Sequence, residues 1–364
     1  MADDALPEIG YYSLAGGPLT PRDAIAEATL AEEIGIGSAF LSERYNVKEA
    51  ATITGALGAV TTELGIATGV TNISTRHPQV TIGHATTMQA LTGGRYTLGF
   101  GRGVGMVFAG MGLKQSTTAE LEDFAGIVRR VVSGEFVIGH DGPAGKWPAL
   151  YISPKPAYPV PMLITAFGPR TLRLAARAYD AVVLHTFFSD ETTRRCVETV
   201  RRECERTGRD PAQVRVWSCY ATVRDDLPEA VFLKKTVGRL SSYLQGYGDL
   251  LVQTNGWDPE PLARFRADSV VQSVKGAIDT VATTAELEHI RGLLPAEWLS
   301  AAAIGSPAEC AARVNKQFDL GVDGVIMHGA TPQELAPVVS AYRGIRSATL
   351  HAGLPRNPGA PRPS

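Results

Sequence analysis

The hydrophobic positions of the chain follow one repeating pattern. A short run of aliphatic, β-branched or aromatic residues is followed by a few polar residues or glycines, and then by a longer segment with apolar positions three and four apart. The first kind of segment is typical of a buried β-strand and the second of an amphipathic helix. Residues 9–13 and 23–34 form the first such pair, with Pro21 ahead of the helix. The pattern therefore predicts a chain of β-α units.

This unit recurs along the whole chain. The predicted strands are 9–13, 38–42, 65–72, 96–100, 162–166, 181–185, 214–220 and 324–328. The predicted helices are 23–34, 49–62, 78–91, 117–132, 170–178, 190–206, 306–320 and 332–344. Strands that alternate with helices are typical of a parallel sheet, and eight such units fit a (β/α)8 TIM barrel of the α/β class. We expect residues 1–364 to form this single domain.

Three segments depart from the repeat. Residues 136–161 contain strand-like pieces broken by turn residues, which predicts an inserted hairpin. Residues 228–295 are helical and rich in aromatic residues, which predicts a helical insertion after the seventh strand. Residues 346–364 end in a proline-rich polar stretch, which predicts a flexible tail.

A doubly wound open sheet is the alternative architecture, because it also alternates parallel strands with helices. Its dinucleotide-binding motif has glycines in a G-x-G-x-x-G spacing. The run from Gly99 to Gly105 has a glycine at every second position, so this spacing fails in each frame. The barrel is therefore the favoured fold.

Composition narrows the classes of partner. The chain has 35 basic and 37 acidic residues, and 44% of its residues are hydrophobic. A net charge of −2 provides no basic surface for nucleic acid, and no apolar stretch is long enough for a membrane span. The amino-terminal residues lack the pattern of a secretory signal, and the four cysteines form no close pair. We expect a cytoplasmic protein with reduced thiols and a small-molecule substrate.

The candidate chemistry lies where the predicted strands end, because the carboxyl ends of barrel strands share one rim. The polar and aromatic residues at these positions are Tyr12, Ser13, Ser42, Glu43, Arg44, Thr71, Asn72, Arg102, Phe167, Gly168, His185, Cys219, Tyr220 and His328. This set is polar but weakly charged, and it contains no clustered carboxylate, imidazole or thiolate ligands. It favours a planar, hydrogen-bonding cofactor and predicts no metal site.

The order and spacing of several short motifs resemble the bacterial luciferase-like superfamily. These motifs are Ser42-Glu-Arg-Tyr, Ala67-Thr-Gly-Val-Thr-Asn, Arg76-His-Pro, Gly93-Gly-Arg-Tyr-Thr-Leu-Gly-Phe-Gly-Arg-Gly, Ala166-Phe-Gly-Pro, Gly305-Ser-Pro and Gly321-Val-Asp-Gly. The resemblance spans roughly residues 8–345 and is closest to oxidoreductases that use the deazaflavin coenzyme F420. It implies that enzyme class, coenzyme F420 as cofactor with FMN as the alternative, and a homodimer.

The resemblance also implies residue roles. A non-prolyl cis peptide bond between Gly69 and Val70 would form a bulge against the deazaflavin ring. The cofactor site would also include the glycine loop of the fourth strand and the turn before the helix at 170, which binds the phosphate of the coenzyme tail in this family. The implied cofactor-binding residues are Ser42, Glu43, Gly69, Val70, Asn72, Gly101, Arg102, Gly103, Ala166, Phe167, Gly168, Pro169, Arg170 and His185.

The end of the second strand departs from the family pattern. Many relatives have Asp-His there, and this chain has Glu43 and Arg44. Glu43 can accept a hydrogen bond from the coenzyme, whereas Arg44 stays protonated and cannot act as a base. Arg44 can instead polarise a substrate carbonyl or hold a carboxylate. The alternative is a structural surface network of Glu43, Arg44 and Lys48.

His185 and Val104 also bear on the predicted reaction. His185 ends the sixth strand, and its near-neutral intrinsic pKa makes it a candidate for proton transfer. A lone histidine after an apolar run is, however, more often a buried structural residue. Val104 stands where some relatives carry an acid that donates a proton to the substrate, which argues against a sugar-phosphate dehydrogenase.

The predicted activity is hydride transfer between reduced F420 and a carbonyl, activated alkene or imine of an apolar organic substrate. Arg44, Glu43 and His185 are the predicted catalytic residues. An FMN-dependent monooxygenase of the same superfamily is one alternative, and a barrel that binds a flavin or deazaflavin without turnover is another.

Overall fold

The predicted strands close into a ring. The structure is a computed structural model that describes residues 5–16, 18, 20–45 and 47–362. Among these, eight parallel strands pair side by side, and pairs between β11 and β1 and between β8 and β9 complete the ring. The strands are β1 (Leu6–Tyr12), β2 (Ile36–Leu41), β3 (Gly65–Thr68), β4 (Tyr96–Phe100), β7 (Met162–Ala166), β8 (Ala181–Leu184), β9 (Arg215–Arg224) and β11 (Gly324–His328). The predicted (β/α)8 barrel is confirmed.

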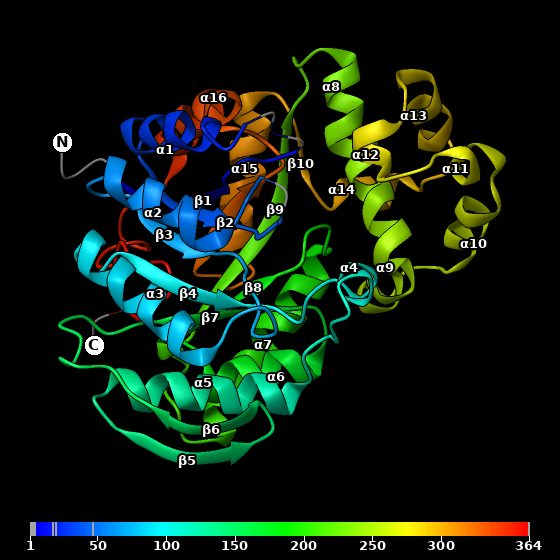
Figure 1. Cartoon of the computed structure of the whole chain (residues 1–364). Coiled ribbons are helices and arrows are strands. Elements are labelled where there is room, and N and C mark those ends of the chain that lie inside the picture. Colours follow the sequence, from blue (N-terminus) through cyan, green and yellow to red (C-terminus); the bar gives the residue numbers. More distant parts are fainter. Residues whose placement is uncertain (1–4, 17, 19, 46, 363–364) are drawn as a thin grey trace.

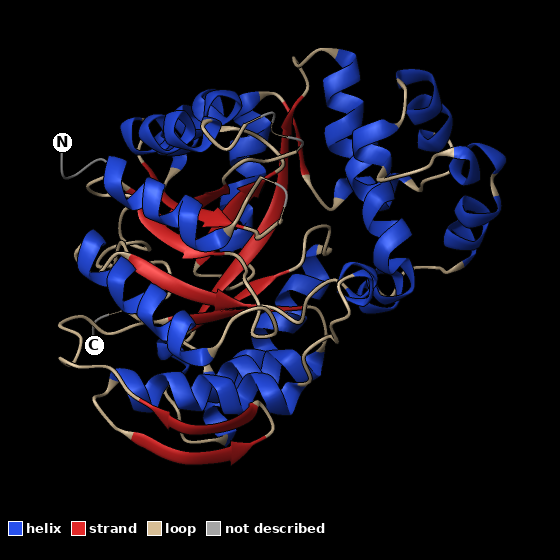
Figure 2. Cartoon of the chain, in the orientation of Figure 1, coloured by secondary structure: helices blue, strands red, loops and turns tan. Residues whose placement is uncertain are grey.

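Helices surround this ring and cover its outer face (Figure 2). Their apolar residues recur three and four apart, so that one side of each helix packs on the strands, as Leu121, Phe124 and Val128 do in α5. Thr117, Ser306 and Thr331 each form a capping box that fixes where a helix begins. The barrel helices are α1 (Asp23–Glu33), α2 (Ala50–Val60), α3 (Pro78–Thr92), α5 (Thr118–Val132), α6 (Pro169–Ala178), α7 (Asp190–Arg206), α15 (Pro307–Phe318) and α16 (Pro332–Ile345).

Side chains fill the inside of the barrel. Phe40 and Trp217 are fully buried there, with ring centroids 5.0 Å apart in an edge-to-face arrangement. Tyr12 and Val70 pack on the same cluster from the carboxyl ends of their strands. The interior is therefore a packed core, and chemistry is confined to the rim above it.

Two insertions leave the barrel at different places. Strands β5 (Val137–Gly142) and β6 (Gly145–Leu150) pair as an antiparallel hairpin outside the barrel helices (Figure 1). The chain that follows β9 forms a separate lobe of helices beside the barrel (Figure 1). This lobe contains α8 (Glu229–Leu233), a π-helical turn (Lys234–Gly238), α9 (Arg239–Asn255), α10 (Glu260–Ala267), α11 (Ser269–Ser273), α12 (Ile278–Val281), α13 (Thr284–Arg291) and α14 (Ala296–Ser300).

The expectation of a flexible tail is wrong for residues 346–362. The Asn357 side chain is 7% exposed and donates hydrogen bonds to the carbonyl oxygens of Gly94 (2.7 Å) and Tyr96 (2.8 Å). The indole of Trp217 donates to the carbonyl oxygen of Pro358 at 2.9 Å. This segment therefore covers the amino-terminal end of the barrel. Proline-rich composition misled the prediction because these bonds come from residues far away in the sequence.

Smaller elements were also absent from the predicted pattern. A short helix, α4 (Gly105–Gly110), follows the glycine loop of β4, and a short strand, β10 (Ala303–Gly305), extends the sheet beside β9. No helix among the described residues is long and apolar enough to cross a membrane. The four cysteines are buried free thiols, as predicted.

Candidate active site

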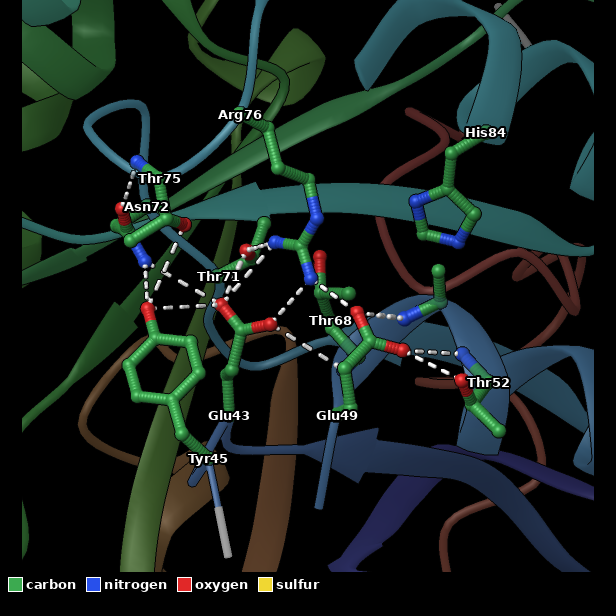
Figure 3. A network of polar contacts seen from close by, with 12 residues as sticks. Glu43, Tyr45, Glu49, Thr52, Thr68, Thr71, Asn72, Thr75, Arg76 and His84 are labelled. Atoms are coloured by element: carbon green, nitrogen blue, oxygen red, sulfur yellow. Dashed lines mark hydrogen bonds and ion pairs between the residues drawn. The ribbon is translucent and has the colours of Figure 1, made fainter. Parts of the chain in front are cut away.

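A buried ion pair organises one side of the rim, between β2 and β3 (Figure 3). The Glu43 carboxylate accepts hydrogen bonds from Arg76 Nη2 (2.5 Å), Thr71 Oγ1 (2.7 Å) and Asn72 Nδ2 (3.3 Å). The backbone N–H of Ala50 donates to Oε1, the oxygen that Arg76 Nη2 also binds, at 3.3 Å. Because these donors occupy both oxygens, Glu43 is held in place by the protein itself. This arrangement argues against the predicted catalytic role of Glu43.

Arg76 also binds a second carboxylate, that of Glu49. Glu49 caps the amino end of α2 and accepts from the backbone N–H of Thr52 at 2.7 Å. Partial burial would raise the pKa of Glu49, but the hydrogen bonds from Thr52, Ala51 and Arg76 lower it to about 2. Sequence reasoning noted Arg76 only as part of a motif, because nothing local to it indicates two distant carboxylates.

The side chain of Asn72 also forms hydrogen bonds within the protein. Its side-chain oxygen accepts from the backbone N–H groups of Ser74 (2.9 Å) and Thr75 (3.0 Å), while its amide donates to Tyr45 Oη at 2.6 Å (Figure 3). This local turn fixes the loop that follows β3. A coenzyme on this side of the rim would therefore meet a rigid loop.

Arg44 and Lys48 lie on the connection between β2 and α2, but they do not form the predicted surface network with Glu43. The two residues pair through their backbones, which excludes the helix that would align them on one face. Arg44 is exposed, and within the described part of the chain its guanidinium donates only to the carbonyl oxygen of Glu43, at 3.2 Å. Lys48 is only 7% exposed, so it lies in the site and not on the surface.

The bulge after β3 has the geometry that the resemblance implied. The peptide bond between Gly69 and Val70 is cis. The N–H of Thr71 donates to the carbonyl of Gly99 at 2.9 Å, and the N–H of Gly101 returns a bond to Thr71 at 2.9 Å. A Cβ on Gly101 would lie 2.5 Å from Val70 Cγ2, so only glycine fits there. Backbone therefore lines this part of the rim.

A cationic group lies beside the amino end of α6. Arg102 donates to Thr171 Oγ1 in the first turn of α6 (3.1 Å) and to Thr118 Oγ1 in α5 (2.7 Å). Gly168 is the N-cap residue of α6 and provides no side-chain cap, while its carbonyl accepts the N–H of Thr171 at 3.1 Å. A Cβ at Gly168 would meet no atom within 4 Å. A helix start without a side-chain cap, open space and a nearby guanidinium together suit an anion.

His185 lies in a cluster of aromatic rings. Its ring centroid is 4.1 Å from that of Phe167 and 4.8 Å from that of Tyr243. Burial lowers the pKa of His185 to about 4, although its contact with the Thr186 carbonyl opposes this. His185 Nδ1 lies 2.8 Å from that carbonyl, so a neutral ring donates from Nδ1 and leaves Nε2 as an acceptor.

The helical insertion supplies residues that sequence reasoning missed. Arg239, Tyr243 and Tyr247 are four residues apart on α9 and face the rim, where the hydroxyl of Tyr243 lies 3.3 Å from His328 Nε2. The His328 ring packs edge-on against Tyr12, with centroids 5.3 Å apart. The four-residue spacing was a usable signal for Arg239 and Tyr243, which share one helical face. Tyr247 lies at a kink in α9, with φ −152° and ψ 38°.

Comparison with known proteins places this barrel in a family. A profile described as luciferase-like monooxygenase matches residues 5–324. The chain belongs to this luciferase-like family. It is 27% identical over 321 residues to a 5,10-methylenetetrahydromethanopterin reductase of Methanolobus tindarius, covering 85% of this chain and 92% of the relative. It is 25% identical over 333 residues to an F420-dependent glucose-6-phosphate dehydrogenase of Microbacterium testaceum, covering 87% and 90%.

Solved structures show the same luciferase-like fold. The coenzyme F420-dependent tetrahydromethanopterin reductase from Methanopyrus kandleri superposes with a TM-score of 0.76 at 16% identity, covering 93% of this chain and 99% of that one. The resemblance inferred from the strand-end motifs is therefore confirmed.

The other predicted site residues lie at or after the ends of β2, β4 and β7. Ala166 and Phe167 lead from β7 to α6 and lie beside Gly168, and Gly103 turns the β4 loop with a φ of +82°. Pro169 and Arg170 are exposed, so Arg170 is solvated in this arrangement. Ser42 is half-buried between β2 and Glu43. The described ranges contain no group of three or more histidine, cysteine, aspartate or glutamate residues arranged to hold a metal ion.

Proposed function

We propose that the protein is an F420-dependent oxidoreductase that transfers hydride between the deazaflavin and a carbonyl, activated alkene or imine of an organic substrate. The observation that carries the proposal is the uncapped amino end of α6 with Arg102 beside it, on a rim lined elsewhere by backbone and aromatic rings. Relatives named as F420-dependent, aligned over most of their length, support it.

The residues present fit such a coenzyme. The amino end of α6 and the guanidinium of Arg102 would hold the phosphate of the tail, since both favour negative charge, and Gly168 leaves the space open. The backbone between Val70 and Gly101 would support a planar ring, because no Cβ at Gly101 projects from it. When bound, the coenzyme supplies the hydride chemistry, and the protein supplies orientation and electrostatics.

His185 is the residue we propose for proton handling. Its neutral ring presents Nε2 as an acceptor, so it can take a hydrogen bond or a proton from a substrate hydroxyl. The rings of Phe167, Tyr243 and Tyr247 pack against His185, while the residue keeps partial exposure. We propose Glu43 and Asn72 as positioning residues, because their polar groups are bound within the protein.

Titration with F420 and with FMN, followed by absorbance difference spectra, tests this function. We expect F420 to bind at least about tenfold more tightly, a difference of about 1.4 kcal/mol. Equal or tighter binding of FMN would instead favour the monooxygenase. Binding of F420 without reduction by any candidate substrate would favour a barrel that binds without turnover.

A further inference from the structure

Three cationic side chains come to the rim from two segments. Arg44 and Lys48 come from the connection between β2 and α2, and Arg239 comes from the first turn of α9. Burial, together with the charges of Arg44 and Arg239, lowers the pKa of Lys48 to about 8. The contacts place these three groups around one space. Lys48 Nζ lies at the carbonyl of Ser13, next to Tyr12. The Tyr12 ring packs on His328, which contacts Tyr243, one turn after Arg239 on α9.

Too few carboxylates face these three cations. Arg239 Nη1 pairs with Asp279 Oδ2 at 2.8 Å. Glu27 attracts Lys48, while it accepts a hydrogen bond from the Leu14 N–H at 2.7 Å. Arg44 has no carboxylate partner within the described residues. Three cations against two carboxylates leave one net positive charge.

Two of the cationic groups also have donors without adequate acceptors. The buried ammonium of Lys48 reaches only the Ser13 carbonyl oxygen among the described residues, at a long 3.5 Å. Arg239 Nε is buried and has no hydrogen-bond partner in the same part of the chain. Unsatisfied buried donors are costly, and a native protein retains them mainly where something else binds.

The same space has an apolar side. The charge of Arg44 acts on Tyr12 and on Tyr247, and that of Arg239 acts on Tyr243. The rings of Tyr243 and Tyr247 stack with centroids 5.9 Å apart. A ligand here would therefore meet cations at one end and aromatic faces along its body.

We propose that the substrate carries a carboxylate, which Arg44, Lys48 and Arg239 bind, while its apolar body lies against Tyr243 and Tyr247. The proposal rests on the proposed function, since it assigns the substrate class of that site. One surplus positive charge matches a monoanion, whereas a phosphate dianion would leave a negative charge in excess. The uncharged aromatic surroundings favour an aryl or alkyl acid over a sugar acid.

Calorimetric titration with 3-phenylpropanoate and with its neutral amide, 3-phenylpropanamide, tests this subsite without turnover. We expect the acid to bind at least about tenfold more tightly than the amide. Lys48→Met and Arg44→Met should each reduce this preference to about threefold or less. Lys146→Met is the matched control, because Lys146 lies on the distant hairpin with a side chain that is 77% exposed.

Two variants are used so that misfolding of one of them does not prevent the test. Lys48→Met removes a desolvated charge at similar volume, and Arg44 is exposed, so at least the second variant should fold normally. Equal binding of acid and amide, or an unchanged preference in both variants, would overturn the subsite. F420 titrations of the same proteins run in parallel. Failure of F420 to bind the wild-type protein counts against the proposed function, while the acid–amide comparison still decides the subsite.

Discussion

Arg76 and Arg44 lie on the same rim, yet their surroundings give them opposite roles. The Arg76 side chain is 14% exposed and connects two carboxylates, one of which, Glu43, is 3% exposed. Arg44 is exposed, and its guanidinium has a single contact, with the Glu43 carbonyl, among the described residues. The first residue therefore stabilises the fold, and the second is available to a ligand. Sequence alone predicted a role for Arg44, and its alternative, an ion network of Glu43, Arg44 and Lys48, did not include Arg76.

Replacing each arginine by methionine tests this contrast. Arg76→Met leaves a buried carboxylate without its partner and should lower the free energy of unfolding by about 3 to 5 kcal/mol. Arg44→Met should change it by no more than about 0.5 kcal/mol. Urea denaturation measures both. The double variant Glu43→Gln, Arg76→Met should recover part of the loss, and equal losses in the two single variants would contradict the assignment.

The pKa of His185 predicts a pH dependence of stability. Burial lowers this pKa to about 4 in the folded protein, whereas an unfolded histidine titrates near 6.5. Between these values the unfolded chain binds the proton and the folded chain does not, so stability falls as pH decreases from about 6.5 to about 4. The slope from one such histidine is at most about 1.4 kcal/mol per pH unit.

His185→Gln should flatten the curve of unfolding free energy against pH over this range, measured by urea denaturation at each pH. His84→Gln should remove a further part, because burial also lowers the pKa of His84 to about 4. Parallel curves for wild-type and His185→Gln would show that His185 titrates normally.

Among the elements, the start of α6 allows coenzyme binding and protein stability to be tested separately. Its N-cap, Gly168, has extended dihedral angles (φ −118°, ψ 172°) that any residue can adopt, and its surroundings leave room for a side chain. Aspartate and asparagine are both favourable at an N-cap. Only aspartate carries a negative charge, so only aspartate would repel a phosphate bound at this helix end.

Gly168→Asp should weaken F420 binding at least about tenfold, because its carboxylate would face the phosphate at the helix end. Gly168→Asn, the neutral control of the same shape, should change the affinity by less than about threefold. Fluorescence titration measures the affinity, and the melting temperature of both variants should equal or exceed that of the wild type. The same affinity in both variants would place the coenzyme tail elsewhere.

The elements differ in how far sequence could predict them. Alternation of strand and helix periods was sufficient for the barrel, since each β-α unit is local in sequence. The strand-end rule also brought Glu43, Asn72, Arg102 and His185 to one rim. The rule could not predict the partners of these residues, because Arg76 and Glu43 come into contact only when the loops that carry them have folded. It also missed the α9 residues, which reach the rim only once the insertion has folded beside it.

On the scale of the whole molecule, residues 355–358 hold the amino-terminal end of the barrel together. The fully buried Arg215 donates to the carbonyl oxygens of Asn357 (3.0 Å) and Pro355 (3.3 Å) from the end of the chain, and to that of Pro7 (3.1 Å) from its beginning. Burial lowers the pKa of Arg215 to about 10. A buried guanidinium is tolerated here because carbonyl groups from both ends of the chain surround it.

Asn357→Ala tests this role. The substitution removes the donor to two carbonyl groups at β4 and should cost about 2 to 4 kcal/mol of unfolding free energy. Leu350→Ala, in the same segment but at a residue that is 47% exposed, is the control and should stay within about 0.5 kcal/mol of the wild type. Thermal and urea denaturation measure both, and equal stability of the two variants would show that the segment only rests on the barrel.

The position of Arg215 also sets an order of events during synthesis. The ribosome makes β9 long before residues 355–358, so an emerging chain that already contains all eight barrel strands still lacks two of the carbonyl groups that this guanidinium binds. Contacts between such distant segments form late. We therefore expect a nascent chain halted after α16 to remain sensitive to proteases, and to become resistant only once Pro358 has left the exit tunnel.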